Sequence, residues 1–359
     1  MKENTDANID ILCVGNAIVD IFVQTDAALL EKYGITETTQ HIEHEKVVDI
    51  LKNFPNYTAV SGGGAANVAK IAAFLGVNAA FIGAAGQDEL SRVFESSLMD
   101  AGVRLFLLRT DKPTGLCVFL QRPKERTRIV AAPSASYLLT ADDVSEESLQ
   151  AARLVVIDGF ILDRIELVRR IFTLAGKYGT VIGLDIGSVG MAQAHAKEVV
   201  QYCSEYPLIL FMNQDEAAAF YQTIHNDLDA EEDAALLEKI KSRVSPFNRK
   251  IQAYFQKLTH ADIFPIIVVK LGAKGAMVFS GGKAHYEPTL AIIPHDPTGA
   301  GDVFCAAFLS AWLRGKSFAD CTAFGNKVAR EALNANGTLM DWNKLKALSK
   351  GAVSTSRAL

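Results

Sequence analysis

Short apolar runs rich in β-branched residues alternate along the chain with longer segments in which apolar residues recur at helical spacing. This alternation is typical of βαβ units, so we expect an α/β fold with a mostly parallel central sheet flanked by helices. The predicted strands are Ile9–Val14, Ala79–Ile82, Leu154–Ile157, Val181–Asp185, Leu208–Met212 and Ile266–Leu271. Sheets of this kind bind ligands beyond the carboxyl ends of their strands, so a site is expected in the loops that follow these runs.

Two regions interrupt the alternation. Gly115–Leu120 and Thr127–Ala131 predict a β-hairpin around a charged turn, too exposed to be a core element of the main sheet. We interpret it as part of a small β lid or subunit-contact sheet, with lid strands at residues 16–25 and 112–132. The segment Ala230–Leu258 mixes charges with apolar residues at helical spacing and predicts a helical hairpin, whose role the pattern leaves open.

Composition narrows the class of protein. The 359 residues suffice for one large α/β domain, which we expect over residues 1–348, followed by a flexible tail at 349–359. The net charge of -5 gives no general attraction for nucleic acid or anionic membranes. The chain opens without a secretory leader and contains no apolar run of membrane-spanning length, which predicts a cytoplasmic protein. Five scattered cysteines and dispersed histidines indicate neither a disulfide framework nor a zinc site.

A glycine-rich loop near the C-terminus carries the strongest chemical signal. Thr298-Gly299-Ala300-Gly301-Asp302 directly precedes Val303–Leu309, an apolar segment that predicts a buried helix. Unpaired N–H groups at such a helix N-terminus can hold phosphoryl oxygens, and Asp302 falls in its first turn. A carboxylate beside a phosphoryl group suits a base that accepts the proton of an attacking hydroxyl. Taken alone, the same residues are equally consistent with helix capping.

The segment Asp296–Asp302, followed by a small-residue helix, resembles the second signature of the ribokinase (PfkB) family of carbohydrate and nucleoside kinases. The resemblance runs from about Ile11 to Gly337. It implies a ribokinase-like three-layer fold with a small β lid, and transfer of the γ-phosphoryl group of ATP to a hydroxyl of a sugar or nucleoside. Mg²⁺ and a monovalent cation such as K⁺ are implied cofactors, and a homodimer formed through the lid is an implied assembly. Asp302 would be the base, and the amides of Gly299, Ala300 and Gly301 would stabilise the oxyanions.

Two upstream motifs correspond to the acceptor side of that family. Ser61–Ala69 is a glycine-rich turn that opens into a small-residue helix, and it resembles the first signature of the family. The resemblance implies that Gly63, Gly64 and Asn67 contact substrate hydroxyls. Asp20 lies in an otherwise apolar stretch, where a carboxylate needs partners, and vicinal hydroxyls would suit it. The resemblance assigns Asp20 and the nearby Asn16 to the substrate. A turn in which Asp20 bonds only to the backbone is the alternative.

Two further motifs correspond to the nucleotide side. Asn213 and Glu216 follow an apolar strand and match the family pattern Asn-x-x-Glu, in which Glu216 would hold Mg²⁺ through water; an Asn cap at the start of a helix fits as well. Residues 270–275 resemble the nucleotide loop of the family. The residues assigned to the nucleotide are Asn213, Lys270, Gly272, Gly275 and, on a later helix, Asn326. Asp185 ends a strand but departs from the commoner Asp-x-Asn-x-Arg pattern, which leaves its role open.

Two other functions fit parts of the pattern. A dinucleotide-dependent oxidoreductase would need Gly-x-Gly-x-x-Gly directly after the first strand, and Gly15-Asn16-Ala17 does not provide it. A non-catalytic sugar- or nucleotide-sensing protein of the same fold would be expected to lack the base or the anion loop, and this chain has both. Sugars, phosphosugars and nucleosides all remain candidate acceptors, and no nucleic acid or membrane partner is expected.

Overall fold

The computed structural model describes residues 9–122, 125, 127–225, 249–259, 264–292 and 299–333. Several predictions fall outside these ranges: most of the helical hairpin at 230–258, the first three residues of Asp296–Asp302, and the tail at 349–359. Within the hairpin segment, Arg249–Leu258 is described and forms helix α10. None of the described helices is long and apolar enough to cross a lipid bilayer.

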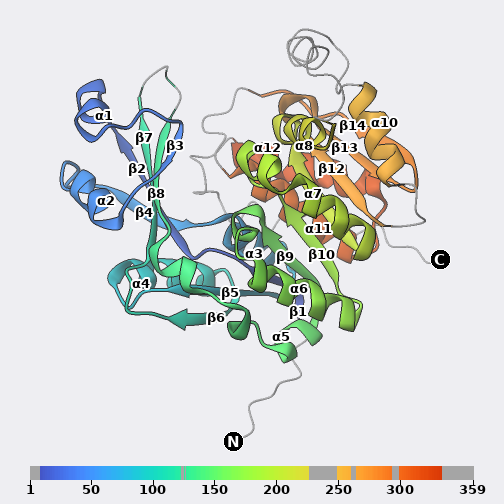
Figure 1. Ribbon diagram of the computed structural model, residues 1–359, viewed down its shortest axis with the longest axis horizontal. Helices are drawn as coiled ribbons and strands as arrows, with labels where there is room; N and C mark the ends of the chain where they lie inside the picture. The colour runs from blue at the N-terminus through green and yellow to red at the C-terminus, as the bar shows by residue number, and fades with distance from the viewer. Residues whose placement is uncertain are drawn as a thin grey trace, which may run out of the picture.

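A nine-stranded sheet forms the centre of the described structure (Figure 1), in the order β14-β13-β12-β11-β10-β9-β1-β5-β6. Its strands from β6 to β12 are parallel, and β13 and β14 add an antiparallel edge. All six predicted strands belong to it, as β1 (Ile9–Val14), β5 (Ala79–Ala85), β9 (Ala152–Asp158), β10 (Val181–Asp185), β11 (Leu208–Asn213) and β12 (Ile266–Lys270). The other three are β6 (Arg104–Arg109), β13 (Ala276–Ser280) and β14 (Lys283–Glu287). The predicted α/β class is confirmed.

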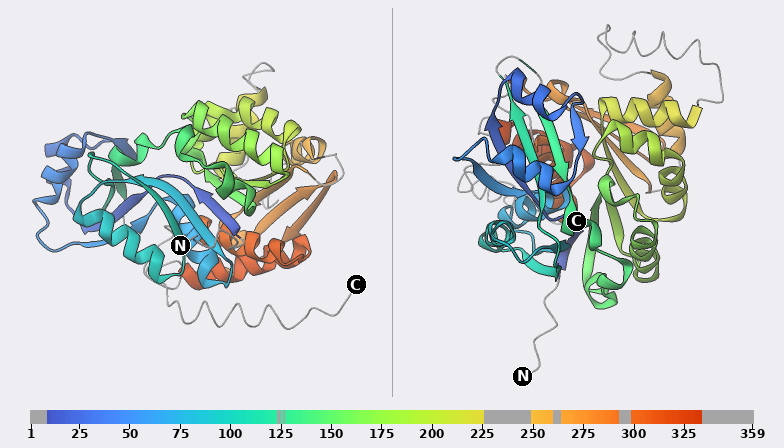
Figure 2. Two further views of the ribbon diagram at one scale, coloured as in Figure 1. Left: turned by 90° about the horizontal axis from the view of Figure 1, so that it is seen from below. Right: turned by 60° about the vertical axis from the view of Figure 1, so that its left-hand side comes forward.

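Helices cover both faces of this sheet (Figure 2). One face packs against α3 (Gly64–Phe74), α4 (Glu89–Asp100), α11 (Ala300–Leu313) and α12 (Phe318–Leu333). The other packs against α5 (Glu146–Gln150), α6 (Ile165–Tyr178), α7 (Val189–Glu205), α8 (Gln214–His225) and α10. Alternate residues of β1 enter the two cores: Ile11 and Cys13 face the first, and Leu12 and Val14 face the second. Burial on both faces explains why these strands are continuous apolar runs.

A second, five-stranded sheet has the order β3-β8-β7-β2-β4. Its strands are β2 (Ile18–Gln24), β3 (Thr39–His41), β4 (Thr58–Gly62), β7 (Gly115–Gln121) and β8 (Arg128–Ala132), and α1 (Ala27–Tyr33) and α2 (His44–Leu51) belong to the same region. The predicted hairpin is present as the antiparallel pair β7 and β8, outside the main sheet. Its expected exposure was wrong, because Leu116, Val118 and Leu120 are buried, and α2 packs against both strands.

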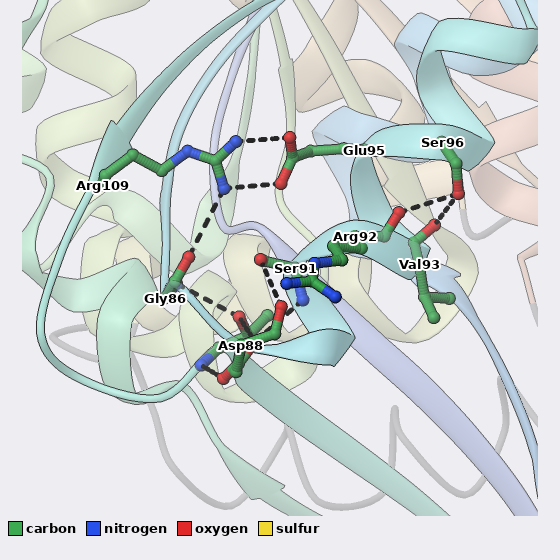
Figure 3. A network of polar contacts seen from close by, with 9 residues as sticks. Gly86, Asp88, Ser91, Arg92, Val93, Glu95, Ser96 and Arg109 are labelled. Atoms are coloured by element: carbon green, nitrogen blue, oxygen red, sulfur yellow. Dashed lines mark hydrogen bonds and ion pairs between the residues drawn. The ribbon is translucent and has the colours of Figure 1, made fainter.

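A polar network fixes the junction between the two sheets (Figure 3). Asp88 caps α4 by accepting a hydrogen bond from Ser91 N at 2.9 Å. It also accepts from the backbone N and the hydroxyl of Thr114, at 2.7 and 2.6 Å, just before β7 begins. These bonds tie the loop after β5 to the entrance of the second sheet. Because the carboxylate is fully engaged by protein groups, we interpret this loop as scaffold.

Candidate active site

The glycine-rich loop opens a buried helix, as its sequence predicts. Gly299 adopts a left-handed conformation with φ 75°, α11 begins at Ala300, and its residues from Val303 to Leu309 are buried. The first-turn amides of Ala300, Gly301 and Asp302 have no acceptor within the helix, since intrahelical bonding begins with Val303 N to the Gly299 carbonyl at 3.0 Å. Their N–H groups and the helix dipole therefore favour an anion at this end.

Asp302 lies in the first turn of α11 and meets a residue that is distant in the sequence. Asn67 Nδ2, on α3, donates a hydrogen bond to Asp302 Oδ2 at 2.9 Å. Burial raises the pKa of Asp302 to about 7; the bond from Asn67 and the charge of Lys270 oppose this rise, whereas the charges of Asp185 and Asp158 add to it. A carboxylate with such a pKa can take up and release a proton near neutral pH.

The first turn of α3 forms one wall of the same site. An added Cβ at Gly64 would lie 3.7 Å from Asp302 Oδ1, so the glycine motif and the base face each other directly. The Asn67 Oδ1 atom is buried and has no hydrogen-bond partner in the described part of the chain, although the Asn67 amide nitrogen donates to Asp302. An unpaired buried acceptor at this place fits a ligand hydroxyl. The structure thus brings Gly64, Asn67 and Asp302 together, as the family resemblance implies.

Asp20, on β2, lies on the side of the site that the family resemblance assigns to the phosphoryl acceptor. Its carboxylate packs against the Cα of Gly62, where an added Cβ would come within 2.2 Å of it. Asp20 is 6% exposed, and burial together with the charge of Asp302 raises its pKa to about 7, against the charge of Lys70. Lys70 is also buried, and its Nζ donates to Ser61 Oγ at 2.8 Å. Sequence reasoning missed Lys70, because a lysine within a helix usually lies at the surface.

Asp158, at the end of β9, is another residue that sequence reasoning missed. Its Oδ2 accepts a hydrogen bond from Ala65 N at 3.2 Å, and its buried Oδ1 has no hydrogen-bond partner among the residues that the structure describes. Burial raises the pKa of Asp158 to about 6. The predicted strand ended at Ile157, one residue too early. Asp158 was therefore not recognised as the last residue of the strand, at the edge of the sheet where ligands bind.

Arg164 determines how Asn16 is oriented. Its Nη2 donates to Asn16 Oδ1 at 2.6 Å, and its Nη1 donates to the Ser136 carbonyl at 2.7 Å. A guanidinium has no acceptor atom, so the oxygen of the Asn16 amide must face Arg164. Asn16 is therefore left with its Nδ2 as the group that can donate to a ligand. Arg164 comes from the loop before α6, and no motif in the sequence pointed to it.

On the nucleotide side, Asn213 and Glu216 bond to each other at the start of α8. Asn213 Oδ1 accepts from Glu216 N at 2.9 Å, and the Glu216 carboxylate accepts from Asn213 N at 2.7 Å and Asn213 Nδ2 at 2.6 Å. The helix-capping interpretation of Asn213 is thus correct. Glu216 is 4% exposed, and burial with the charge of Asp185 raises its pKa to about 7.

Lys270 is the last residue of β12, which lies beside β11, the strand that ends at Asn213. The register of β12 on β11 aligns Lys270 with Asn213, and Lys270 Nζ forms an ion pair with Asp185 Oδ2 at 2.6 Å. Asp185, whose role the sequence left open, is therefore part of this edge. Gly272 and Gly275 form the turn from β12 to β13, with φ of 59° and 100°. Asn326 and Gly275 both adjoin the Glu287 carbonyl, to which Asn326 Nδ2 donates at 3.1 Å.

The residues present fit a magnesium ion held mainly through water. In the described part of the chain, no three His, Cys, Asp or Glu side chains are grouped closely enough to form a metal cage. The site does contain the buried carboxylate of Glu216 and the partly buried carboxylate of Asp185, whose Oδ1 has no hydrogen-bond partner among the described residues. Acidic side chains outnumber basic ones in the site: the carboxylates are Asp20, Asp158, Asp185, Glu216 and Asp302, and the cations are Lys70, Arg164 and Lys270. A hydrated divalent cation suits this excess of oxygen donors and of negative charge.

Comparison with known proteins agrees with this architecture. Residues 27–344 match the pfkB family of carbohydrate kinases. The chain is 22% identical over 343 residues to an adenosine kinase of Dictyostelium discoideum, covering 92% of this chain and 96% of that protein. It is 24% identical over 351 residues to a ribokinase of Arabidopsis thaliana, covering 95% and 80%. The crystal structure of an adenosine kinase from Sinorhizobium meliloti matches with a TM-score of 0.79 at 22% identity, covering 97% of this chain and all of that one.

The ribokinase-like fold expected from the sequence is thereby confirmed. The family match spans the glycine motif of α3, the Asn213–Glu216 pair and the first turn of α11. This chain belongs to the pfkB family of carbohydrate kinases.

Proposed function

We propose that this kinase transfers the γ-phosphoryl group of ATP to a hydroxyl of a nucleoside, with Asp302 accepting the proton of that hydroxyl. The observation that carries the proposal is the position of Asp302. Its carboxylate stands in the first turn of α11 and accepts a hydrogen bond from Asn67 of the glycine motif, its charge acts on Asp20, and Lys270 Nζ lies beside the neighbouring Gly301. A hydroxyl bound on the Asp20 side and a phosphate bound on the Lys270 side would meet at this carboxylate.

On the acceptor side, the available groups suit a polyol. The unpaired Asn67 Oδ1 and Asp158 Oδ1 accept hydrogen bonds from ligand hydroxyls, and the Asp20 carboxylate binds a vicinal pair. Asn16 donates through Nδ2, because Arg164 occupies its oxygen. In this assignment Gly63 and Gly64 provide the closely approachable backbone that the ligand lies against.

On the nucleotide side, the first-turn amides of α11 stabilise the oxyanions of the phosphoryl group in transit. We assign Asn213, Lys270, Gly272, Gly275 and Asn326 to the nucleotide. Glu216 would hold a hydrated Mg²⁺, which would neutralise phosphate charge when bound. Because the transition state of phosphoryl transfer is loose, Asp302 needs to align the hydroxyl and take its proton late, which demands little base strength.

A nucleoside is favoured over a free sugar because aromatic side chains are exposed beside the polar site. Tyr137 and Phe160 are 51% and 41% exposed. The ring of Tyr137 lies 5.7 Å from the guanidinium carbon of Arg164, and Phe160 adjoins Gly187, two residues after Asp185. Exposed aromatic surface next to buried hydrogen-bonding groups is typical of a pocket for a planar ring. The adenosine kinases among the relatives make the same choice of acceptor reasonable. Dependence on a monovalent cation, dimer formation through the second sheet and a cytoplasmic location remain predictions.

The test is an acceptor screen with the purified full-length chain, Mg²⁺ and ATP. ADP release would be measured against a panel of purine and pyrimidine nucleosides, ribose, fructose and phosphosugars, and the products identified by mass spectrometry. We expect a nucleoside monophosphate as the main product. Turnover with free sugars alone would refute the nucleoside assignment, and absence of acceptor-dependent ADP release across the panel would refute the kinase proposal itself.

A further inference from the structure

A largely buried ion pair lies beside the first turn of α11, which is assigned to phosphoryl binding. Lys270 is the last residue of β12, and its Nζ contacts Asp185 Oδ2 at 2.6 Å, with both side chains 14% exposed. Cys305, one turn into α11, completes the cluster: its Sγ donates to Asp185 Oδ2 at 3.0 Å and lies 3.8 Å from Lys270 Nζ. The ammonium group is thus held between the end of β10 and the beginning of α11.

The ammonium group also touches the anion loop itself. An added Cβ at Gly301 would lie 3.2 Å from Lys270 Nζ, so the side chain passes immediately beside the Gly301 backbone. A larger residue at position 301 would displace the ammonium or the loop. Lys270 therefore brings a full positive charge to the turn whose free amides already favour an anion, one residue from Asp302. The combination of a cation with oriented amides is typical of sites that hold phosphoryl oxygens.

A purely structural role accounts poorly for this pair. Burying two charges costs desolvation energy that their attraction offsets only in part, and apolar residues of similar volume are often at least as stabilising. In addition, Asp185 Oδ1 is buried and has no hydrogen-bond partner within the described ranges, so only one oxygen of this carboxylate is bonded there. An unsatisfied oxygen beside a fixed cation indicates that a ligand or its hydration shell completes the cluster.

We propose that Lys270 is a catalytic residue that contacts the phosphoryl group in transit, and that Asp185 is a positioning residue that holds the Lys270 ammonium beside the first turn of α11. This inference rests on the proposed kinase function. During transfer, the bond from phosphorus to the oxygen that leaves with ADP breaks, the bond to the acceptor oxygen forms, and Asp302 takes the acceptor proton. Lys270 exchanges no proton; its charge stabilises the negative charge on the phosphoryl and leaving oxygens.

The test compares Lys270→Met, Asp185→Asn and the double variant with the wild type, and uses Lys283→Met, on the exposed part of β14, as the matched control. Three quantities are measured for each: kcat with the best acceptor of the panel, the affinity for Mg²⁺-ADP by calorimetry, and the melting temperature. The double variant is decisive, because it removes both charges and leaves no uncompensated buried ion to unfold the protein.

We expect Lys270→Met to lower kcat by about 100- to 1000-fold, the usual loss for one group that stabilises a transition-state oxyanion. Affinity for Mg²⁺-ADP should change much less, because the contact is made mainly with the phosphoryl group in transit. Asp185→Asn should lose less activity than Lys270→Met, since the ammonium keeps its charge. The double variant should melt close to the wild type and remain as inactive as Lys270→Met, while Lys283→Met matches the wild type throughout.

Recovery of near-normal kcat in the double variant would overturn the proposal and leave the pair as a structural ion pair. A uniform loss of ADP affinity with unchanged kcat would overturn it also, since Lys270 would then serve nucleotide binding alone. Both outcomes require an active wild type and leave the kinase function standing. A wild type that is inactive with every acceptor would instead refute the proposed function, and this inference with it.

Discussion

The stability of the ligand-free protein should fall as pH rises from 5 to 8, because its active site buries acids that prefer to be protonated. Burial raises the pKa of Asp302 from 3.8 to about 7 and those of Asp20 and Glu216 to about 7 as well. A group whose pKa is higher in the folded chain than in the unfolded chain binds its proton more tightly when folded. The stability that it contributes is complete below the unfolded pKa and is lost as pH rises through the folded value.

Asp302→Asn isolates one of these acids. The variant keeps an oxygen for the hydrogen bond from Asn67 and removes the charge. A change in pKa from 3.8 to about 7 corresponds to about 4 kcal/mol if the group titrates alone. Asp302 keeps some solvent contact, and its neighbours are coupled to it, so we expect a difference on the order of 2 kcal/mol at pH 8. The variant should therefore be more stable than the wild type at pH 8, and the difference should shrink steadily as pH falls toward the unfolded-state pKa of 3.8.

The assay is urea unfolding of both proteins at a series of pH values in metal-free buffer, with the free energy of unfolding compared at each. A matched control is Asp111→Asn, at an exposed position in the loop between β6 and β7, which should leave the pH dependence of stability unchanged. If Asp302→Asn is no more stable than the wild type at pH 8, or if the difference between them does not vary with pH, Asp302 is not a buried acid with a raised pKa.

Three further predictions follow from single contacts. Asp20→Asn should raise the KM of the acceptor by about 10- to 100-fold and leave the KM of ATP nearly unchanged, because the hydrogen bonds to a charged group that are lost are those to the acceptor. Steady-state kinetics with each substrate varied in turn would show this difference. A rise in the KM of ATP alone would contradict it. Gly63→Ala should lower the free energy of unfolding by about 1–3 kcal/mol, because φ is 91° and the new Cβ would lie 2.3 Å from the Asn16 carbonyl oxygen. The control is Gly315→Ala, where φ is 69° and the added Cβ would enter open space, so urea unfolding should show a smaller decrease in the free energy of unfolding than for Gly63→Ala. Equal decreases in the two variants would show that the steric clash at Gly63 does not matter. Chelation of Mg²⁺ should abolish turnover while acceptor binding by calorimetry persists, and turnover in excess chelator would contradict the metal assignment.

The main sheet was predictable because its strands are buried on both faces and therefore stand out as continuous apolar runs. The strand β6 escaped prediction because Arg104 and Arg109 bound it and its residues are only partly buried at the sheet edge. The second sheet was recognised from the β7–β8 hairpin, but β3 and β4 were not. β3 has three residues, and β4 leads directly into the glycine motif of α3.

The candidate site was predictable where glycines and polar residues form local motifs, and it was missed where its chemistry depends on tertiary contacts. Asn67 was assigned to the substrate, yet its Nδ2 bonds Asp302, 235 positions away in the sequence. Lys70 and Arg164 gain their roles only because the fold buries them beside Asp20 and Asn16. No spacing rule within one segment could reveal such pairs, since the partners come from different elements of the fold.

The role of Asp302 is tested most directly by transfer of labelled γ-phosphate from ATP to a nucleoside, measured in a single turnover with wild-type enzyme and with Asp302→Asn, at saturating Mg²⁺-ATP. We expect the wild type to yield labelled nucleoside monophosphate and the variant to be slower by orders of magnitude, while its affinity for ATP is nearly unchanged. Transfer by Asp302→Asn at close to the wild-type rate would contradict the central claim that this carboxylate is the base.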